Sequence, residues 1–130
     1  MHSLIIYTDG GARGNPGPAG IGVHIEGVAD FKEYIGKATN NQAEYKAVVL
    51  ALQKAKELGA KEMKFYLDSE LVVKQLSGEY KIKDKELSKL FVQAWNLTLS
   101  FKKVLFFHVP REKNKKADKL VNEAIDDALK

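Results

Sequence analysis

The sequence predicts an α/β domain built on a mixed β-sheet, and three observations support this prediction. The first is a continuous apolar run, LIIYTD, typical of a strand buried on both faces. The second is a series of three strand-like segments with short connections, all before residue 39. The third is the succession of strand and helix patterns in the remaining chain. Together they predict an antiparallel meander joined to parallel strands and flanked by helices.

The meander is predicted over residues 4–9, 20–27 and 31–38. The first of these segments is the apolar run, which ends in Asp9. GIGVHIEG and FKEYIGKA follow with the length and composition of antiparallel strands, and only VAD separates them.

The middle of the chain predicts a long helix, a strand and a short helix. Residues 39–59 have helical spacing, with Thr39, Asn40 and Asn41 as candidate N-caps and Gly59 as a C-terminal stop. Residues 62–68, EMKFYLD, form a predicted strand that ends in an aspartate, and residues 69–78 form a predicted short helix.

The last third predicts a helix over 83–99, a strand over 103–109 closed by Pro110, and a helix over 114–129. Apolar side chains recur at helical spacing in the first of these helices, and we expect them to face the core. They are Leu87, Leu90, Phe91, Ala94 and Trp95.

Length and composition favour one globular domain spanning residues 1–130, with 45% hydrophobic and 29% charged residues. The chain has no cysteine, no signal-peptide pattern and no apolar run near the roughly 20 residues of a membrane span. We therefore expect a cytoplasmic, monomeric protein with no membrane role.

The positive charge is concentrated in one block. The net charge is +4, but residues 79–119 hold eleven basic and five acidic side chains. Such a block attracts phosphate backbones, although a solvated lysine-rich surface would have the same composition.

Four carboxylates stand in unusual places. Asp9 and Asp68 end two predicted strands, which would bring them to one edge of the sheet if the strands are parallel neighbours. Glu44 and Asp118 lie on or beside the apolar stripes of their helices. Each acid alone is compatible with turn capping or with a favourable helix-dipole position.

The four acids together favour a metal site. Carboxylates cannot share a pocket in the ionised form unless cations neutralise them. A ligand set made only of carboxylate oxygens favours Mg²⁺ or Mn²⁺ and leaves positions open for two-metal phosphoryl chemistry.

The chain resembles the type 1 ribonuclease H family (ribonuclease HI) in four segments that follow the family's order over nearly all 130 residues. They are YTDGGARGNPGPAGIG, TNNQAEYKAVVLAL, YLDSELV and HVPREKNKKADKLVNEAI. The resemblance implies the ribonuclease H-like fold, a five-stranded mixed sheet flanked by helices. It also implies an endoribonuclease that hydrolyses the RNA strand of RNA–DNA hybrids by a two-metal-ion mechanism, leaving 5′-phosphate and 3′-hydroxyl ends.

The resemblance also implies roles for individual residues. It makes the four acids the catalytic metal ligands for two Mg²⁺ or Mn²⁺ ions, with Asp9 bridging both. Substrate contacts are expected from the glycine-rich segment, from the residues beside the acids and from the loop before the last helix. These residues are Gly10, Gly11, Arg13, Gly14, Asn15, Asn40, Asn41, Ser69 and Arg111, with Glu112 as an auxiliary residue.

Two features differ from many members of the family and match its protrusion-free archaeal and bacterial branch. SGEYKIKDKEL stands where many bacterial members have a basic, tryptophan-rich protrusion, and the loop PREKNKK lacks a histidine. A non-catalytic domain of the same fold that binds hybrid or double-stranded RNA is the alternative. The sequence also leaves open whether an active enzyme would cut double-stranded RNA.

Overall fold

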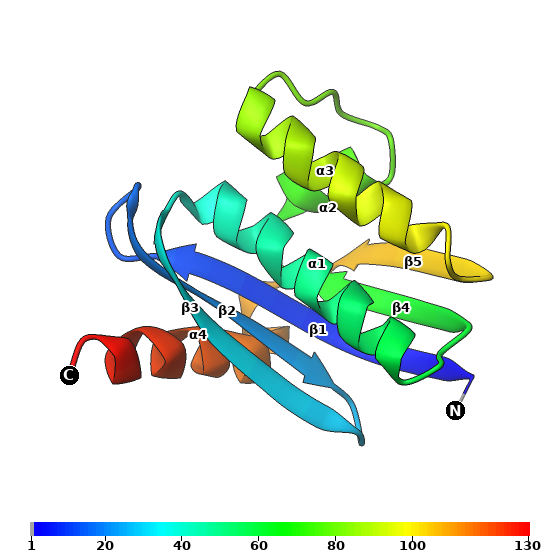
Figure 1. Ribbon diagram of the computed structural model, residues 1–130, viewed down its shortest axis with the longest axis horizontal. Helices are drawn as coiled ribbons and strands as arrows, with labels where there is room; N and C mark the ends of the chain where they lie inside the picture. The colour runs from blue at the N-terminus through cyan, green and yellow to red at the C-terminus, as the bar shows by residue number, and fades with distance from the viewer. Residues whose placement is uncertain (1) are drawn as a thin grey trace.

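The computed structural model describes residues 2–130, and a single five-stranded sheet runs through them (Figure 1). Its strands are β1 (Ser3–Ala12), β2 (Gly17–Ile25), β3 (Ala29–Ala38), β4 (Glu62–Leu67) and β5 (Lys103–His108). The order across the sheet is β3-β2-β1-β4-β5. β1 pairs antiparallel with β2 and parallel with β4, so the predicted combination of a meander and parallel strands is confirmed.

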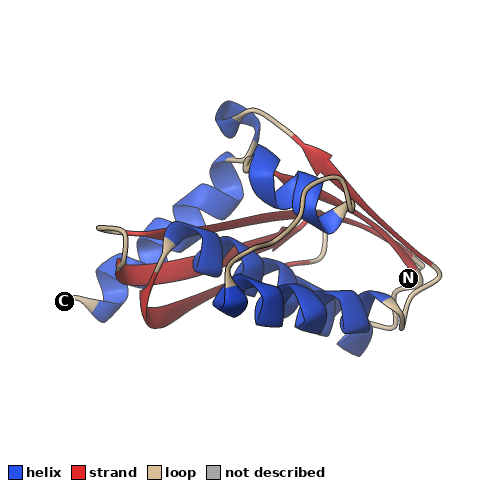
Figure 2. Ribbon diagram, turned by 90° about the horizontal axis from the view of Figure 1, so that it is seen from above, coloured by secondary structure: helices blue, strands red, loops and turns tan. Residues whose placement is uncertain are grey.

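Helices cover the two faces of the sheet unequally. They are α1 (Asn40–Glu57), α2 (Glu70–Leu76), α3 (Lys85–Thr98) and α4 (Lys115–Ala128), with a 3-10 turn η1 (Arg111–Lys113) before the last one. The first three lie on one face and α4 lies alone on the other, as Figures 1 and 2 show. Within residues 2–130, no helix has the length and apolar character needed to cross a membrane.

The main core lies between α1 and the sheet. Ile6 of β1, Phe65 of β4 and Leu52 of α1 are completely buried there. Tyr45 is also buried, and its hydroxyl donates a 2.7 Å hydrogen bond to Gln75 in α2. Burial of side chains of this size stabilises the fold by about 1.5–3 kcal/mol each, so α1 is firmly held against the strands that carry the acids.

The start of α1 follows the sequence signal. Thr39 caps the helix by accepting a hydrogen bond from the Gln42 N–H at 3.1 Å, and the Gln42 side chain accepts one from the Thr39 N–H at 2.9 Å. This reciprocal capping box confirms the predicted N-cap and defines the first turn, one turn before Glu44.

β1 continues beyond its predicted end. The prediction that Asp9 terminates the strand is wrong, because pairing with β2 continues to Ala12 opposite Ala19. Pairing with β4 ends earlier, at Tyr7 opposite Tyr66. Asp9 therefore lies inside β1 at a point where the strand has a neighbour on one side only.

The apolar stripe of α3 is only partly in the core. Leu87 and Ala94 are buried as expected, but Trp95 is 53% exposed, so its predicted core position is wrong. Trp95 instead stacks on Phe91 with ring centroids 6.2 Å apart. The reason is tertiary, because α3 packs along α1 on one side and no further layer covers its outer side. Residues 77–84 join α2 to α3 directly, without an additional helix.

Glycines allow two helices to approach the sheet closely. A methyl group at Gly10 would overlap the main-chain carbonyl of Ala43 in α1. On the other face, a methyl group at Gly22 would overlap the main-chain carbonyl of Ala117 in α4. Because Ala43 and Ala117 immediately precede Glu44 and Asp118, these close contacts set the distance of both helical acids from the sheet.

We predict that Gly10→Ala destabilises the fold by about 3 kcal/mol or more, because neither main chain can retreat without opening the core. The matched control is Gly11→Ala in the next position, where an added methyl group would meet nothing closer than 3.8 Å. Urea unfolding of both variants measures the difference. Equal stability of the two variants would contradict the proposed close contact.

Candidate active site

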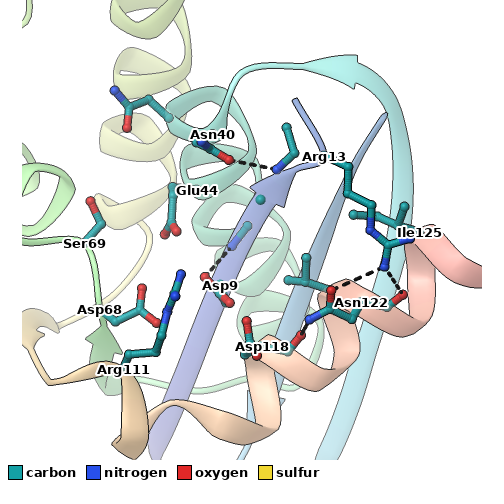
Figure 3. Close-up of a pocket in the computed structure, with 15 residues that line it drawn as sticks. Asp9, Arg13, Asn40, Glu44, Asp68, Ser69, Arg111, Asp118, Asn122 and Ile125 are labelled. Atoms are coloured by element: carbon teal, nitrogen blue, oxygen red, sulfur yellow. Dashed lines mark hydrogen bonds between the residues drawn. The ribbon is translucent and has the colours of Figure 1, made fainter. Parts of the chain in front are cut away.

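Acidic side chains from four elements meet at one edge of the sheet (Figure 3). Asp9 lies in β1, two residues beyond its last pair with β4, and Asp68 directly follows β4. Glu44 comes from α1 and Asp118 from the first turn of α4. This edge holds the carboxyl ends of the parallel strands, where ligands bind in open α/β sheets.

The structure brings these carboxylates into one cavity of about 360 Å³. One carboxylate oxygen from each of Asp9, Glu44 and Asp68 lies within 4.8 Å of the other two. Asp118 is outside this group of three but lines the same cavity. The four acids are thus neighbours, with Asp118 on the α4 side.

Burial makes these charges costly. Asp9 and Glu44 are each only 7% exposed, while Asp68 and Asp118 are half-buried. Burial, and next the charge of Asp68, raise the pKa of the Asp9 carboxyl from 3.8 to about 7. Burial and the neighbouring Asp9 raise the pKa of Glu44 well above its ordinary value. Without a cation, this site therefore holds protons near neutral pH.

The donor set fits a hard divalent cation. The Oε2 atom of Glu44 is buried and has no hydrogen-bond partner within residues 2–130. The Oδ1 atom of Asp9 accepts a 3.0 Å hydrogen bond from the Gly10 N–H, which leaves its second oxygen for another partner. Carboxylate oxygens whose lone pairs accept no hydrogen bond are available to Mg²⁺ and Mn²⁺, which prefer oxygen ligands. Zn²⁺ usually takes nitrogen or sulfur.

Most of the residues predicted to contact substrate line this cavity, whereas two of them and the predicted auxiliary residue do not. The lining includes Gly10, Gly11, Arg13, Asn40, Asn41, Ser69 and Arg111. Gly14, Asn15 and Glu112 lie outside it. Glu112 is part of η1 and lines a different cavity, together with Tyr7 and Lys113.

Several of these predicted contacts already have structural partners. The Asn40 side chain accepts a 2.9 Å hydrogen bond from the Ala12 N–H, and the Asn40 N–H donates to Asn15 at 3.0 Å. This pair of bonds fastens the loop after β1 to the start of α1. Ser69 caps α2 by accepting a 3.3 Å hydrogen bond from the Val72 N–H.

Arg13 connects the same loop to α4. Its guanidinium lies 2.7 Å from the carboxylate of Asp126. It also lies 3.4 Å from the side-chain oxygen of Asn122 (Figure 3). The contacts are exposed, so each contributes little to stability. They nevertheless hold a positive charge at the rim of the acidic cavity.

Gly10 has a packing role in addition to the expected one. It lines the cavity, and it also lies in β1 beneath α1, where the lack of a side chain admits that helix. A methyl group at Gly11 would be in ordinary contact with Val121 at 3.8 Å, and Gly14 adopts a φ of 87°, which favours glycine.

Two asparagines near the acids were missed by sequence reasoning. Asn122 lines the cavity and donates a 3.1 Å hydrogen bond to the Asp118 carbonyl. Asn114 is buried beside Asp68 and donates to its carboxylate at 3.3 Å. Asn114 stands four residues before Asp118 at a helix start, a position where asparagine is ordinarily interpreted as a cap.

The sheet order, the flanking helices and this acidic edge define a ribonuclease H-like domain. The chain belongs to the Reverse transcriptase-like protein family, which it matches over residues 8–124, and within it to the type 1 ribonuclease H domains. The expected family and fold are therefore confirmed.

Similar proteins come from bacteria and archaea. The chain is 46% identical over 131 residues to the bifunctional protein Rv2228c of Mycobacterium tuberculosis, covering 96% of this chain and 36% of that protein. It is also 46% identical over 127 residues to ribonuclease HI of Halobacterium salinarum, covering 94% of this chain and 64% of that one. The chain thus spans about a third of the length of the mycobacterial relative.

Solved structures superimpose closely. The N-terminal RNase H domain of Rv2228c gives a TM-score of 0.95 at 44% identity, covering 99% of this chain and 97% of that one. LC11-RNase H1, solved in complex with an RNA/DNA hybrid, gives a TM-score of 0.93 at 47% identity, covering 98% of this chain and 99% of that one.

The raised pKa of Asp9 leads to a prediction for the protein without metal. Between about pH 4 and pH 7 the folded state binds more protons than the unfolded state, so stability falls as pH rises through this window. Asp9→Asn removes the ionisable group. We expect this variant to be more stable than the unsubstituted protein at pH 8 by about 2 kcal/mol or more.

Thermal unfolding in a chelator at pH 4, 6 and 8 tests this expectation. The difference should become small near pH 4, where Asp9 is protonated in the folded state and close to its ordinary pKa of 3.8 in the unfolded state. Added Mg²⁺ should stabilise the unsubstituted protein more than the variant. An Asp9→Asn protein that is no more stable at pH 8 would show that the acids do not strain the fold.

Proposed function

We propose that this chain is an endoribonuclease that hydrolyses the RNA strand of RNA–DNA hybrids, leaving 5′-phosphate and 3′-hydroxyl ends. The observation that carries the proposal is the convergence of Asp9, Glu44, Asp68 and Asp118 on one cavity. The printed names of the similar proteins support it, since one is a ribonuclease HI and another was solved with an RNA/DNA hybrid.

The four acids would hold two Mg²⁺ or Mn²⁺ ions, with Asp9 shared between them. Bound divalent ions supply charge neutralisation at the phosphoryl group and lower the pKa of a bound water. Glu44 and Asp9 are buried, so their carboxylates are held in fixed orientations. Asp68 and Asp118 are half-buried and border the open part of the cavity, where a phosphodiester enters.

The remaining lining residues would bind and orient the hybrid. Arg111 is exposed at the cavity and has the planar fork that suits a phosphate. Arg13 offers a second guanidinium across the cavity, held there by α4. Gly11 lines the cavity without a side chain, so a nucleic-acid backbone could approach the main chain of β1 there. Asn41, which also lines the cavity, offers an amide that can recognise the 2′-hydroxyls of RNA.

The competing proposal is a domain of the same fold that binds hybrid or double-stranded RNA without cutting it. A site that had lost its activity would normally lack one of the acids, but all four line one cavity here, so the geometry favours the enzyme. Cleavage of double-stranded RNA stays a second possible activity.

We further propose that residues 1–130 act as one monomeric domain in the cytoplasm, an expectation that rests on composition and the absence of cysteine.

The decisive experiment uses end-labelled RNA–DNA, RNA–RNA and DNA–DNA duplexes of one sequence, with Mg²⁺, Mn²⁺ or a chelator. We expect metal-dependent cutting of the RNA strand in the hybrid and none of DNA–DNA. Binding of the hybrid without cutting in either metal would instead support the binding domain.

Glu44→Gln should lower kcat by on the order of 100-fold or more. Losing a residue that only supports a metal ligand costs 10–100-fold, and a ligand itself should cost at least as much. Glu57→Gln is the matched control, because it makes the same substitution at an exposed position of the same helix. Wild-type kcat in Glu44→Gln would contradict the assignment of the site.

Asp118→Asn should also slow turnover while leaving the melting temperature nearly unchanged.

A further inference from the structure

Asn114, the residue before α4, is buried beside Asp68 of the acidic site. Its side chain is 1% exposed and is among the largest fully buried side chains of the protein. Buried polar groups normally make hydrogen bonds, so the partners of this amide indicate what the side chain does.

Those partners connect three segments that carry acids. The Nδ2 group donates a 2.9 Å hydrogen bond to the main-chain carbonyl of Thr8, the residue before Asp9. The same group donates to the Oδ2 atom of Asp68 at 3.3 Å. The main-chain carbonyl of Asn114 accepts a 3.1 Å hydrogen bond from the Asp118 N–H. One residue therefore touches β1, the end of β4 and the first turn of α4.

Helix capping does not explain this side chain. Asn114 occupies the N-cap position of α4, but its side chain makes no capping hydrogen bond to the described helix. Its Oδ1 atom has no partner within residues 2–130 either. All of the hydrogen bonding of the amide is at its donor end, which is directed to Thr8 and Asp68.

A neutral donor suits this position chemically. A lysine or arginine in the same place would also hold Asp68, but its charge would cancel part of the negative potential that attracts a cation. An amide orients the carboxylate and leaves its charge in place. Supporting groups of this kind determine how well a carboxylate ligand is presented to a metal.

We propose that Asn114 is a positioning residue that orients Asp68 relative to Asp9 for divalent-cation binding. It acts through Asp68 and does not itself contact the reacting atoms. The kinetic part of this inference rests on the proposed function, while the cation-binding part can be tested separately.

The test compares Asn114→Leu with Gln75→Leu. Both variants replace a buried, hydrogen-bonded amide by an apolar group of similar size, but Gln75 bonds to Tyr45 and not to an acid. Calorimetric titration of the substrate-free proteins with Mn²⁺ is the first readout. We expect Asn114→Leu to bind Mn²⁺ at least about 10-fold more weakly than the unsubstituted protein. Gln75→Leu should stay within about 2-fold, although both variants lose thermal stability.

The second readout is hybrid cleavage by Asn114→Ser, which keeps an N-cap side chain and adds no charge, but is shorter than the amide that bonds to Asp68. We expect kcat to fall about 10–100-fold with KM within about 3-fold. A capping role would preserve kcat, so an Asn114→Ser protein with wild-type kcat overturns the proposal. This variant also carries the test if Asn114→Leu does not fold.

The outcomes separate the two proposals. If the unsubstituted protein binds Mn²⁺ but cuts no hybrid, the proposed function fails, and weaker Mn²⁺ binding by Asn114→Leu still supports the positioning role. If Asn114→Leu binds Mn²⁺ as tightly as the unsubstituted protein, the positioning role is wrong whatever the cleavage activity.

Discussion

Carboxylates that share one cavity repel one another, and the surrounding helices and strands must oppose this repulsion. Asp9 and Glu44 are almost fully buried, and Asp68 adds a third acid within the same few ångströms. Left to themselves, these groups would move apart or take up protons. The fold keeps them together because the helices and strands that carry them are held by other interactions. α1 is held by its capping box and by the main core, and β1 is held by its long pairing with β2.

Close contacts between main chains fix the positions of the helices relative to the sheet. Side chains can change rotamer, but the contacts of Gly10 with α1 and of Gly22 with α4 join backbone to backbone. Glu44 and Asp118 each follow the residue that makes such a contact, so their Cα positions vary little. The glycine-rich character of β1 and β2 is therefore as much a part of the acidic site as the acids.

Much of this arrangement could be predicted from the sequence, and the exceptions have physical causes. The strand and helix order follows from hydrophobic periodicity, and the four acids stand out because they interrupt apolar patterns. The extension of β1 past Asp9 could not be predicted, because glycines pair in a strand only when a neighbour such as β2 supplies the partners. The exposure of Trp95 depends on which side of α3 another element covers. The role of Asn114 could not be predicted, because an asparagine at a helix start has the same sequence pattern whether its amide caps the helix or points into the site.

The contrast between the buried acids and the exposed rim has a consequence for how such a domain can be altered. Arg13 and Arg111 border the cavity but lie at the surface, where substitutions usually change stability by less than about 0.5 kcal/mol. Gly10 and Gly22 allow no such freedom, because an added methyl group would overlap the main chain of a helix. Evolution or protein engineering can therefore vary the rim of the cavity while the buried acids and the packing around them stay the same.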